Sequence, residues 1–189
     1  MFNIEIEKKY LAAHLPRVIK NVEPIRLFDV YFPDDPAEEA HLRARKSNNN
    51  YELTKKIPVV GPHSTARLET TIALSRAEFE SITAGHERII EKERYKVSIS
   101  GHRAQVDVFT GKLAGLILIE INFEDEVHMR GFNKPSCCGT EITDENFIIG
   151  GLLAACTYED IKPHLDRLGY QPILSNATQG DMEQASVPN

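Results

Sequence analysis

The chain has 189 residues, which fits one ordinary domain or two small ones with a proper hydrophobic core. It carries 22 basic and 28 acidic residues, and the formal charge of −6 argues against a surface that binds nucleic acid or an anionic membrane. Hydrophobic residues make up 41% and charged residues 26%, a balance that excludes an intrinsically disordered protein.

The sequence also predicts a compartment. The longest apolar stretch, residues 147–156, is too short to span a bilayer, so we expect no membrane partner. Charged residues already lie among the first ten, where a secretory signal would be apolar, and this predicts the cytoplasm. The three cysteines cannot all pair and have no zinc-ligand spacing, so we expect free thiols.

Alternation of residue type with a period of two runs to about residue 124 and predicts a mainly antiparallel β protein with a few helices, an α+β fold. Turn residues at 47–50, 58–64, 100–101 and 111–115 separate the strands. About eight strands in succession is the number that closes a barrel. The predicted strands are residues 2–10, 27–32, 40–46, 51–57, 66–72, 89–98, 103–110 and 116–124.

Helices are expected between the strands and after them. Ser75 and Glu78 form a capping box that begins a short helix, and Gly85 ends it. A second helix is predicted from Thr143, and a third over residues 157–168. The second is expected to bury Phe147, Ile148, Leu152 and Leu153. We therefore predict a single domain over residues 1–175, with the barrel at about 1–125, a helical part at about 143–169, and a disordered tail over 176–189.

Charged side chains occupy one face of strand after strand. Acidic residues gather on the first, seventh and eighth predicted strands, and basic residues on the third and sixth. A solvated outer face explains any single strand, but outer faces usually mix both signs of charge, so the separation favours an interior. If the sheet closes with these faces inward, the apolar residues at the other alternate positions point outward, and helices must cover them.

Such an interior suits a particular chemistry. Arginine and lysine from several strands match a compact polyanion such as a chain of phosphates. Clustered carboxylates match the hard divalent cations Mg²⁺ and Mn²⁺. The two together predict metal-assisted phosphoryl transfer, in which the basic side chains hold the charge that develops on the phosphate oxygens.

Residues 5–9 near the start of the sequence, EIEKK, resemble the ExExK signature of CYTH domains, the triphosphate tunnel metalloenzymes. The likeness covers about residues 1–155 in the family's order. It continues through LRAR at 42–45, LTKK at 53–56, RLE at 67–69, KERY at 92–95, VDVF at 106–109, GLILIE at 115–120 and GTEIT at 139–143. The resemblance implies an eight-stranded, closed antiparallel β-barrel, the triphosphate tunnel, whose members hydrolyse tripolyphosphate, nucleoside triphosphates or thiamine triphosphate, or cyclise ATP.

The resemblance also assigns roles to residues. It implies that Glu5, Glu7 and Glu120 bind the metal, with Glu69 and Asp107 binding it directly or through water, and these five with Lys9 are the expected catalytic set. Asn122 replaces a glutamate that is usual in the family's last strand; its carbonyl can still coordinate the metal, at the cost of one negative charge. The implied phosphate ligands are Lys9, Arg43, Arg45, Lys56, Arg67, Lys92 and Arg94.

We therefore expect a triphosphatase that uses Mg²⁺ or Mn²⁺ and cleaves inorganic tripolyphosphate. Aromatic residues are 7% and Trp is absent, so a small phosphate ranks above a nucleotide such as ATP. Thiamine triphosphate stays a possible substrate. Two alternatives stay open: a class IV-like adenylate cyclase that converts ATP to cyclic AMP, and a non-catalytic triphosphate- or nucleotide-binding module, which Asn122 favours. No nucleic-acid partner is expected, and a homodimer stays open.

Overall fold

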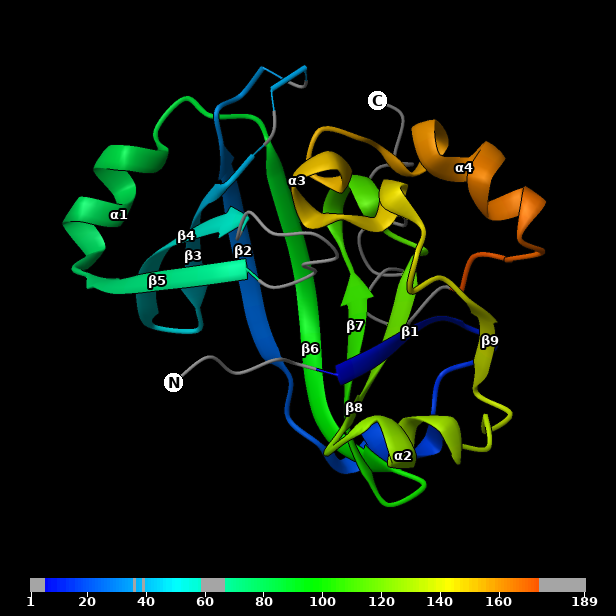
Figure 1. Cartoon of the computed structure of the whole chain (residues 1–189). Helices are drawn as coiled ribbons and strands as arrows, with labels where there is room; N and C mark the ends of the chain where they lie inside the picture. The colour runs from blue at the N-terminus through cyan, green and yellow to red at the C-terminus, as the bar shows by residue number, and fades with distance from the viewer. Residues whose placement is uncertain (1–5, 36, 39, 59–66, 174–189) are drawn as a thin grey trace.

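The computed structural model describes residues 6–35, 37–38, 40–58 and 67–173. Its main feature is a nine-stranded sheet in the order β5-β4-β3-β2-β6-β7-β8-β1-β9, in which every neighbouring pair is antiparallel (Figure 1). The strands are β1 (Ile6–Ala12), β2 (Ile25–Phe32), β3 (Leu42–Ser47), β4 (Asn50–Pro58), β5 (Arg67–Leu74), β6 (Ile89–Ile99), β7 (His102–Phe109), β8 (Ile117–Phe123) and β9 (Cys138–Glu141).

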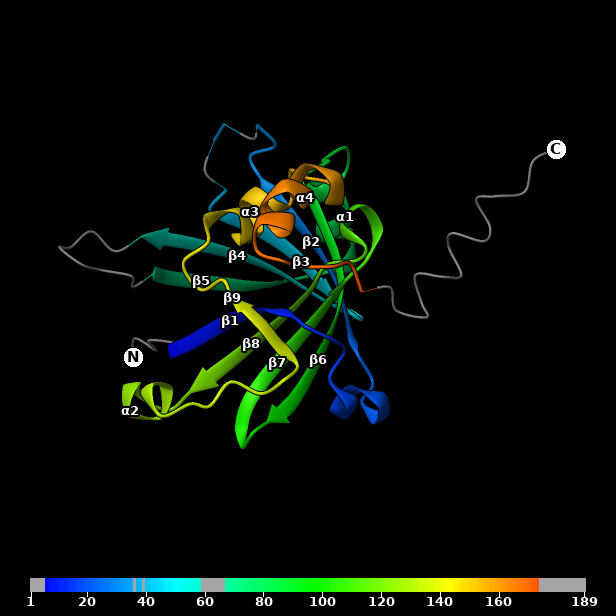
Figure 2. The ribbon, with the colours of Figure 1, turned by 90° about the vertical axis from the view of Figure 1, so that its right-hand side faces the viewer.

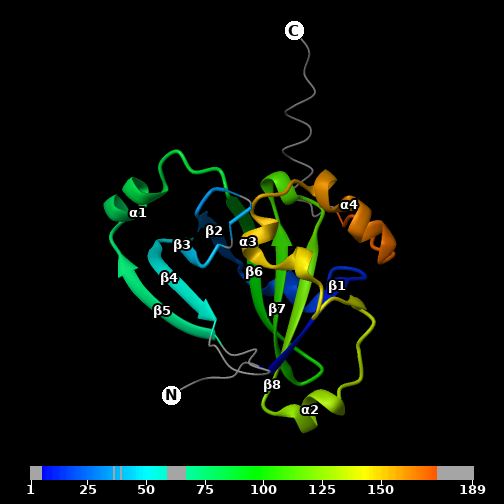
Figure 3. The same ribbon diagram turned by 45° about the horizontal axis from the view of Figure 1, so that its top comes forward.

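The predicted antiparallel sheet is confirmed, but the predicted eight-stranded closed barrel is wrong. A ninth strand, β9, pairs with β1 through Tyr10↔Glu141 and Ala12↔Cys138, and so occupies an edge of β1 that closure would need. Within the described residues the sheet therefore has two edges, β5 and β9. The sheet is curled, as Figure 3 shows. We call the concave side of the curled sheet the trough.

One face of this curled sheet, which we call the concave face, carries the charged residues that occupy every second position of the strands. Side chains of directly paired residues in an antiparallel sheet point to the same face, so the strand register identifies its members. Following the register from β1 to β5 places on this face Glu7, Lys9, Glu120, Asn122, Gln105, Asp107, Lys92, Arg94, Asp29, Arg43, Arg45, Thr54, Lys56 and Glu69.

The apolar residues at the intervening strand positions form a core on the opposite, convex face, which we also call the outer face. Val106, Ile119 and Ile121 are fully buried there. The 3₁₀ helix η1 (Arg17–Asn21) and the helix α2 (Glu126–Arg130) pack over this core, and α1 (Arg76–Thr83) packs Phe79 against the outer-face rings of Phe28 and Tyr51. Of these three elements the sequence predicts α1, whereas η1 and α2 were not predicted.

A second apolar cluster closes one end of the concave face. Leu11, Ile90 and Phe109 lie on the concave face of β1, β6 and β7, next to the charged side chains of the same strands. They are apolar and are buried in this cluster. The covering elements are η2 (Gly111–Leu113), η3 (Asn146–Ile148), α3 (Gly150–Leu153) and α4 (Tyr158–Arg167), which gather at that end of the sheet (Figures 1 and 2). The concave face is thus charged in its middle and plugged at one end.

Local sequence explains where the helices begin. Capping boxes at Ser75 and Thr157 begin α1 and α4. The long helix predicted from Thr143 is wrong, because only η3 and the one-turn α3 form there; Leu153 is buried, whereas Leu152 is 42% exposed. Gly150 permits this packing, since a Cβ atom there would collide with the hydroxyl group of Tyr31.

None of the helices in the described ranges is long and apolar enough to cross a lipid bilayer. The predicted tail, residues 176–189, lies outside the described residues, and so does Glu5.

Candidate active site

Basic side chains meet in the middle of the concave face around two buried carboxylates. Asp107 accepts hydrogen bonds from Lys92 Nζ at 2.6 Å, Arg94 Nε at 2.6 Å and Arg94 Nη2 at 2.7 Å. Asp29 accepts from Nε and Nη2 of Arg45, both at 2.6 Å. Because β2 and β6 are neighbours in the sheet, the two groups lie side by side and form one cluster.

The cluster holds more positive than negative charge. Burial disfavours the ionised carboxyl of Asp107, but Lys92 and Arg94 outweigh this effect and hold its pKa well below the ordinary value. Burial likewise opposes ionisation of Asp29, and Arg45 nevertheless keeps the pKa of Asp29 low. The pKa of Lys92 is lowered, chiefly by burial, even though Asp107 favours its charged form. The buried carboxylates therefore do not fully neutralise the basic side chains, and an anion that enters would be attracted to them.

Arg43 shows this incomplete neutralisation most directly. Its Nη2 lies 3.9 Å from Oε1 of Glu52, too long for a hydrogen bond. Its Nε is buried and has no hydrogen-bond partner among the described residues. A buried donor without a partner is costly, so Arg43 is ready to bind an anion that enters the trough.

The wall formed by β1 and β8 is acidic. Lys9 Nζ lies 2.7 Å from Oε1 of Glu7 and 3.7 Å from Oε2 of Glu120, and Gln105 Nε2 donates to Oε1 of Glu120 at 3.3 Å. Burial and the nearby charge of Glu7 raise the pKa of Glu120 to about 7, against the opposing charge of Lys9. Burial lowers the pKa of Lys9, but its pairing with Glu7 and Glu120 raises it overall. One ammonium group does not fully neutralise the two acids.

This wall fits a hard divalent cation. Glu7 and Glu120 supply carboxylate oxygens, and Asn122 lies opposite Glu7 in the register with an amide oxygen. Oε1 of Gln105 is buried with no partner in the described part of the chain, and adds another oxygen donor beside Glu120. No three acidic, His or Cys side chains of the described ranges already form a metal cluster, and Glu5 lies outside those ranges.

Not every predicted site residue belongs to the basic cluster or the acidic wall. Lys56 and Glu69 form an ion pair with each other on β4 and β5, at the opposite end of the sheet order from β1. Arg67 begins β5, but its side chain lies outside the described part. Both oxygens of Asp107 contact nitrogen atoms, which favours a counter-ion over the predicted metal ligand.

Sequence reasoning missed two residues of this site. Asp29 is completely buried and binds Arg45. Its signal in the sequence is a single acid on the alternate positions of a strand that otherwise carry Ile25, Leu27 and Tyr31. Gln105 gave no comparable signal, because an amide on a polar strand face is ordinary.

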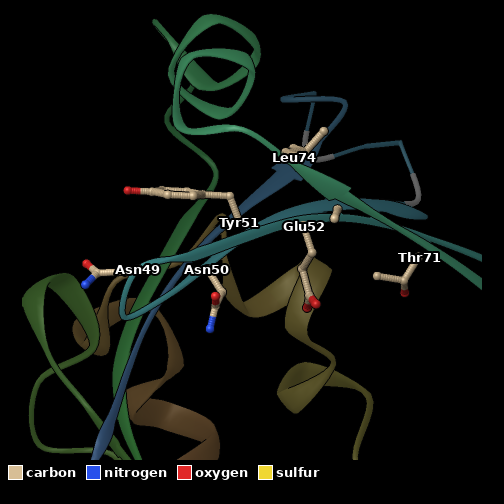
Figure 4. Close-up of a pocket in the computed structure, with 7 residues that line it drawn as sticks. Asn49, Asn50, Tyr51, Glu52, Thr71 and Leu74 are labelled. Carbon is tan, nitrogen blue, oxygen red and sulfur yellow. The ribbon is translucent and has the colours of Figure 1, made fainter.

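A hollow of about 330 Å³ lies beside the basic cluster, at the β3–β4 turn and the edge strand β5. It is lined by Asn49, Asn50, Tyr51, Glu52, Thr71, Ala73 and Leu74. Figure 4 shows Asn50 and Glu52 on one side of the hairpin and Tyr51 pointing another way, as strand alternation requires. None of the predicted site residues lines this hollow.

The buried Asp29–Arg45 pair predicts how stability depends on pH. Because the pKa of Asp29 is lower in the folded state than its unfolded value of about 3.9, its contribution is present above pH ~4 and is lost as the pH falls through the folded pKa. Urea unfolding of the wild type and of Asp29→Asn at pH 7, 5 and 3 checks this. We expect the difference in unfolding free energy to be equal at pH 7 and 5 and smaller at pH 3; a difference that grows at pH 3 contradicts the assignment.

Known proteins resemble this chain over most of its length. The CYTH domain family model matches residues 3–129. An inorganic triphosphatase from Nitrosomonas europaea is 32% identical over 143 residues, which cover 75% of this chain and 90% of that protein. An inorganic triphosphatase from Acetivibrio thermocellus is 30% identical over 162 residues, covering 84% and 97%. A crystal structure of an inorganic triphosphatase superposes with a TM-score of 0.65 at 28% identity, covering 82% of this chain and 96% of that one.

Proposed function

This chain belongs to the CYTH domain family, and on that premise we propose that it is a metal-dependent triphosphatase that cleaves inorganic tripolyphosphate to pyrophosphate and phosphate. The observation that carries the proposal is the basic cluster of the concave face, whose four cations, Arg43, Arg45, Lys92 and Arg94, face two buried carboxylates among the described residues. The names of the two relatives favour tripolyphosphate over an organic triphosphate.

The chain's own side chains bind and align the substrate. The arginine guanidinium groups donate paired hydrogen bonds to phosphate oxygens, and Lys92 adds a point charge. These charges stabilise the negative charge on the phosphoryl oxygens in the transition state. Leu11 and Phe109, with the helices that cover them, exclude water from one end of the trough, so a linear polyanion enters from the other.

The acidic wall on β8 and β1 is separated from the β6 side of the basic cluster by β7 alone. Glu7, Glu120 and Asn122 would hold Mg²⁺ or Mn²⁺, which when bound shields phosphate charge and makes bound water more acidic. Lys9 lies between Glu7 and Glu120 and is placed to donate a hydrogen bond to a terminal phosphate oxygen. We keep the cytoplasm as the proposed compartment, which the free thiols of Cys137, Cys138 and Cys156 support.

A phosphate-release assay tests the proposal. Tripolyphosphate, ATP and thiamine triphosphate are each supplied with Mg²⁺, with Mn²⁺ or with a chelator. We expect release from tripolyphosphate with either cation and none with the chelator. Arg43→Ala is expected to reduce kcat/KM by about tenfold or more, whereas Lys46→Ala, on the outer face of the same strand, should have no effect.

Two outcomes overturn the proposal. Cyclic AMP formed from ATP without phosphate release from tripolyphosphate identifies a cyclase. Binding of tripolyphosphate without release under any of these conditions identifies a binding module.

A further inference from the structure

Arg45 and Arg94 are held in the same way by two different carboxylates. Each guanidinium donates through Nε and Nη2 to one buried aspartate, Asp29 for Arg45 and Asp107 for Arg94, at 2.6–2.7 Å. A guanidinium has five N–H groups, and this side-on contact uses two of them on one edge. The edge formed by Nη1 and the remaining Nη2 hydrogen stays available, and it is the edge that can form a fork with a phosphate group.

Asp29 cannot itself meet a ligand. Its side chain is completely buried beneath Arg45, whereas the side chain of Arg45 is 13% exposed. Asp29 lies directly opposite Arg45 in the β2–β3 register, on the concave face. Arg45, and not Asp29, therefore reaches the trough.

We propose that Asp29 is a positioning residue that fixes Arg45 with its free guanidinium edge toward the bound phosphate chain. The proposal rests on the proposed function, because it assumes that phosphate groups occupy the trough. A purely structural role explains the pair less well, because a buried ion pair is often no more stabilising than apolar residues of the same size. A pre-oriented arginine saves the ordering cost that a mobile one pays when it binds.

The test is a double-mutant cycle on binding and turnover. The affinity for tripolyphosphate is measured by titration calorimetry in a chelator, without turnover, and KM and kcat are measured with Mg²⁺. We expect Asp29→Asn to weaken binding and raise KM by about tenfold, with a smaller change in kcat. Arg45→Lys keeps the charge but loses the side-on fork, so it should weaken binding similarly, and adding Asp29→Asn to it should change affinity less than twofold.

Val30→Ala is the matched control. Val30 is the next residue of β2, fully buried on the outer face, so the substitution destabilises the fold but should leave KM and affinity unchanged. If Asp29→Asn only lowers the melting temperature, as Val30→Ala does, the role is structural and the proposal is overturned. Unchanged or tighter binding also overturns it, because removal of a negative charge alone would favour the anion.

A second measurement, made on the wild-type protein, tests the proposal if the Asp29→Asn variant fails to fold. In the free wild-type protein, the Nε–H of Arg45 should give a nitrogen-15 NMR signal protected from solvent exchange, identified by its absence in Arg45→Lys. Rapid exchange of that proton overturns the proposal. If the wild type binds tripolyphosphate without hydrolysing it, the proposed function fails and the binding cycle still decides the role of Asp29; if it binds none, both fail.

Discussion

Replacing Glu120 with glutamine is expected to reduce tripolyphosphate hydrolysis, or the affinity for Mg²⁺ and Mn²⁺, by about 100-fold or more, since even residues that only support a metal ligand cost 10- to 100-fold. The substitution keeps the shape of the side chain but removes one of the two carboxylate charges beside Lys9. The remaining acid, Glu7, would then be largely neutralised by the Lys9 ammonium at 2.7 Å. Phosphate release measured against cation concentration checks this.

The control for this variant is Glu93→Gln, which changes a carboxylate on the outer face of β6. We expect its cation dependence to match that of the wild type. Partial recovery of Glu120→Gln at high cation concentration supports a metal-site role. If Glu120→Gln keeps the wild-type cation dependence and loses only turnover, Glu120 acts on the reacting groups and does not hold the cation.

Alternation of residue type was enough to predict most of the sheet. The eight predicted strands reappear within a few residues at each end, apart from residues 2–5 of the first, which lie outside the described residues. Polar and apolar residues alternate along sequences such as LRAR at 42–45 and IEINF at 119–123. β9 escaped prediction because its four residues, CGTE, show too little alternation to indicate a strand. Whether the sheet closes depends on which segment pairs with the edge of β1, and that is a contact between residues more than a hundred positions apart.

The charged face was predictable for the same reason, but the partners within it were not. Alternation places Lys92, Arg94 and Asp107 on one face without saying which atoms meet. The pairing of Asp29 with Arg45 next to Lys92 requires β2 to lie between β3 and β6, although residues 33–88 separate β2 from β6 in the chain. Asp107 was therefore expected to bind metal with the other acids, whereas its position in β7 opposite Arg94 gives it cations as neighbours.

Replacing Asp107 with alanine is expected to lower the free energy of unfolding by about 3–5 kcal/mol, because it leaves two buried cations, Lys92 and Arg94, without their counter-ion. In a domain of this size, such a loss corresponds to a fall in Tm of roughly 10 °C. Urea unfolding and thermal melting in a chelator measure both. Glu93→Ala, at a more exposed carboxylate of the neighbouring strand, should cost less than about 1 kcal/mol.

Tripolyphosphate should then restore part of the lost stability. A phosphate group can take over the role of the missing carboxylate, so saturating tripolyphosphate is expected to raise the Tm of Asp107→Ala by more than it raises that of the wild type. A metal ligand would behave differently. If Asp107→Ala keeps the wild-type stability in a chelator and loses only the stabilisation that Mg²⁺ gives, Asp107 belongs to the acidic wall of the trough, and Lys92 and Arg94 do not need it to remain buried.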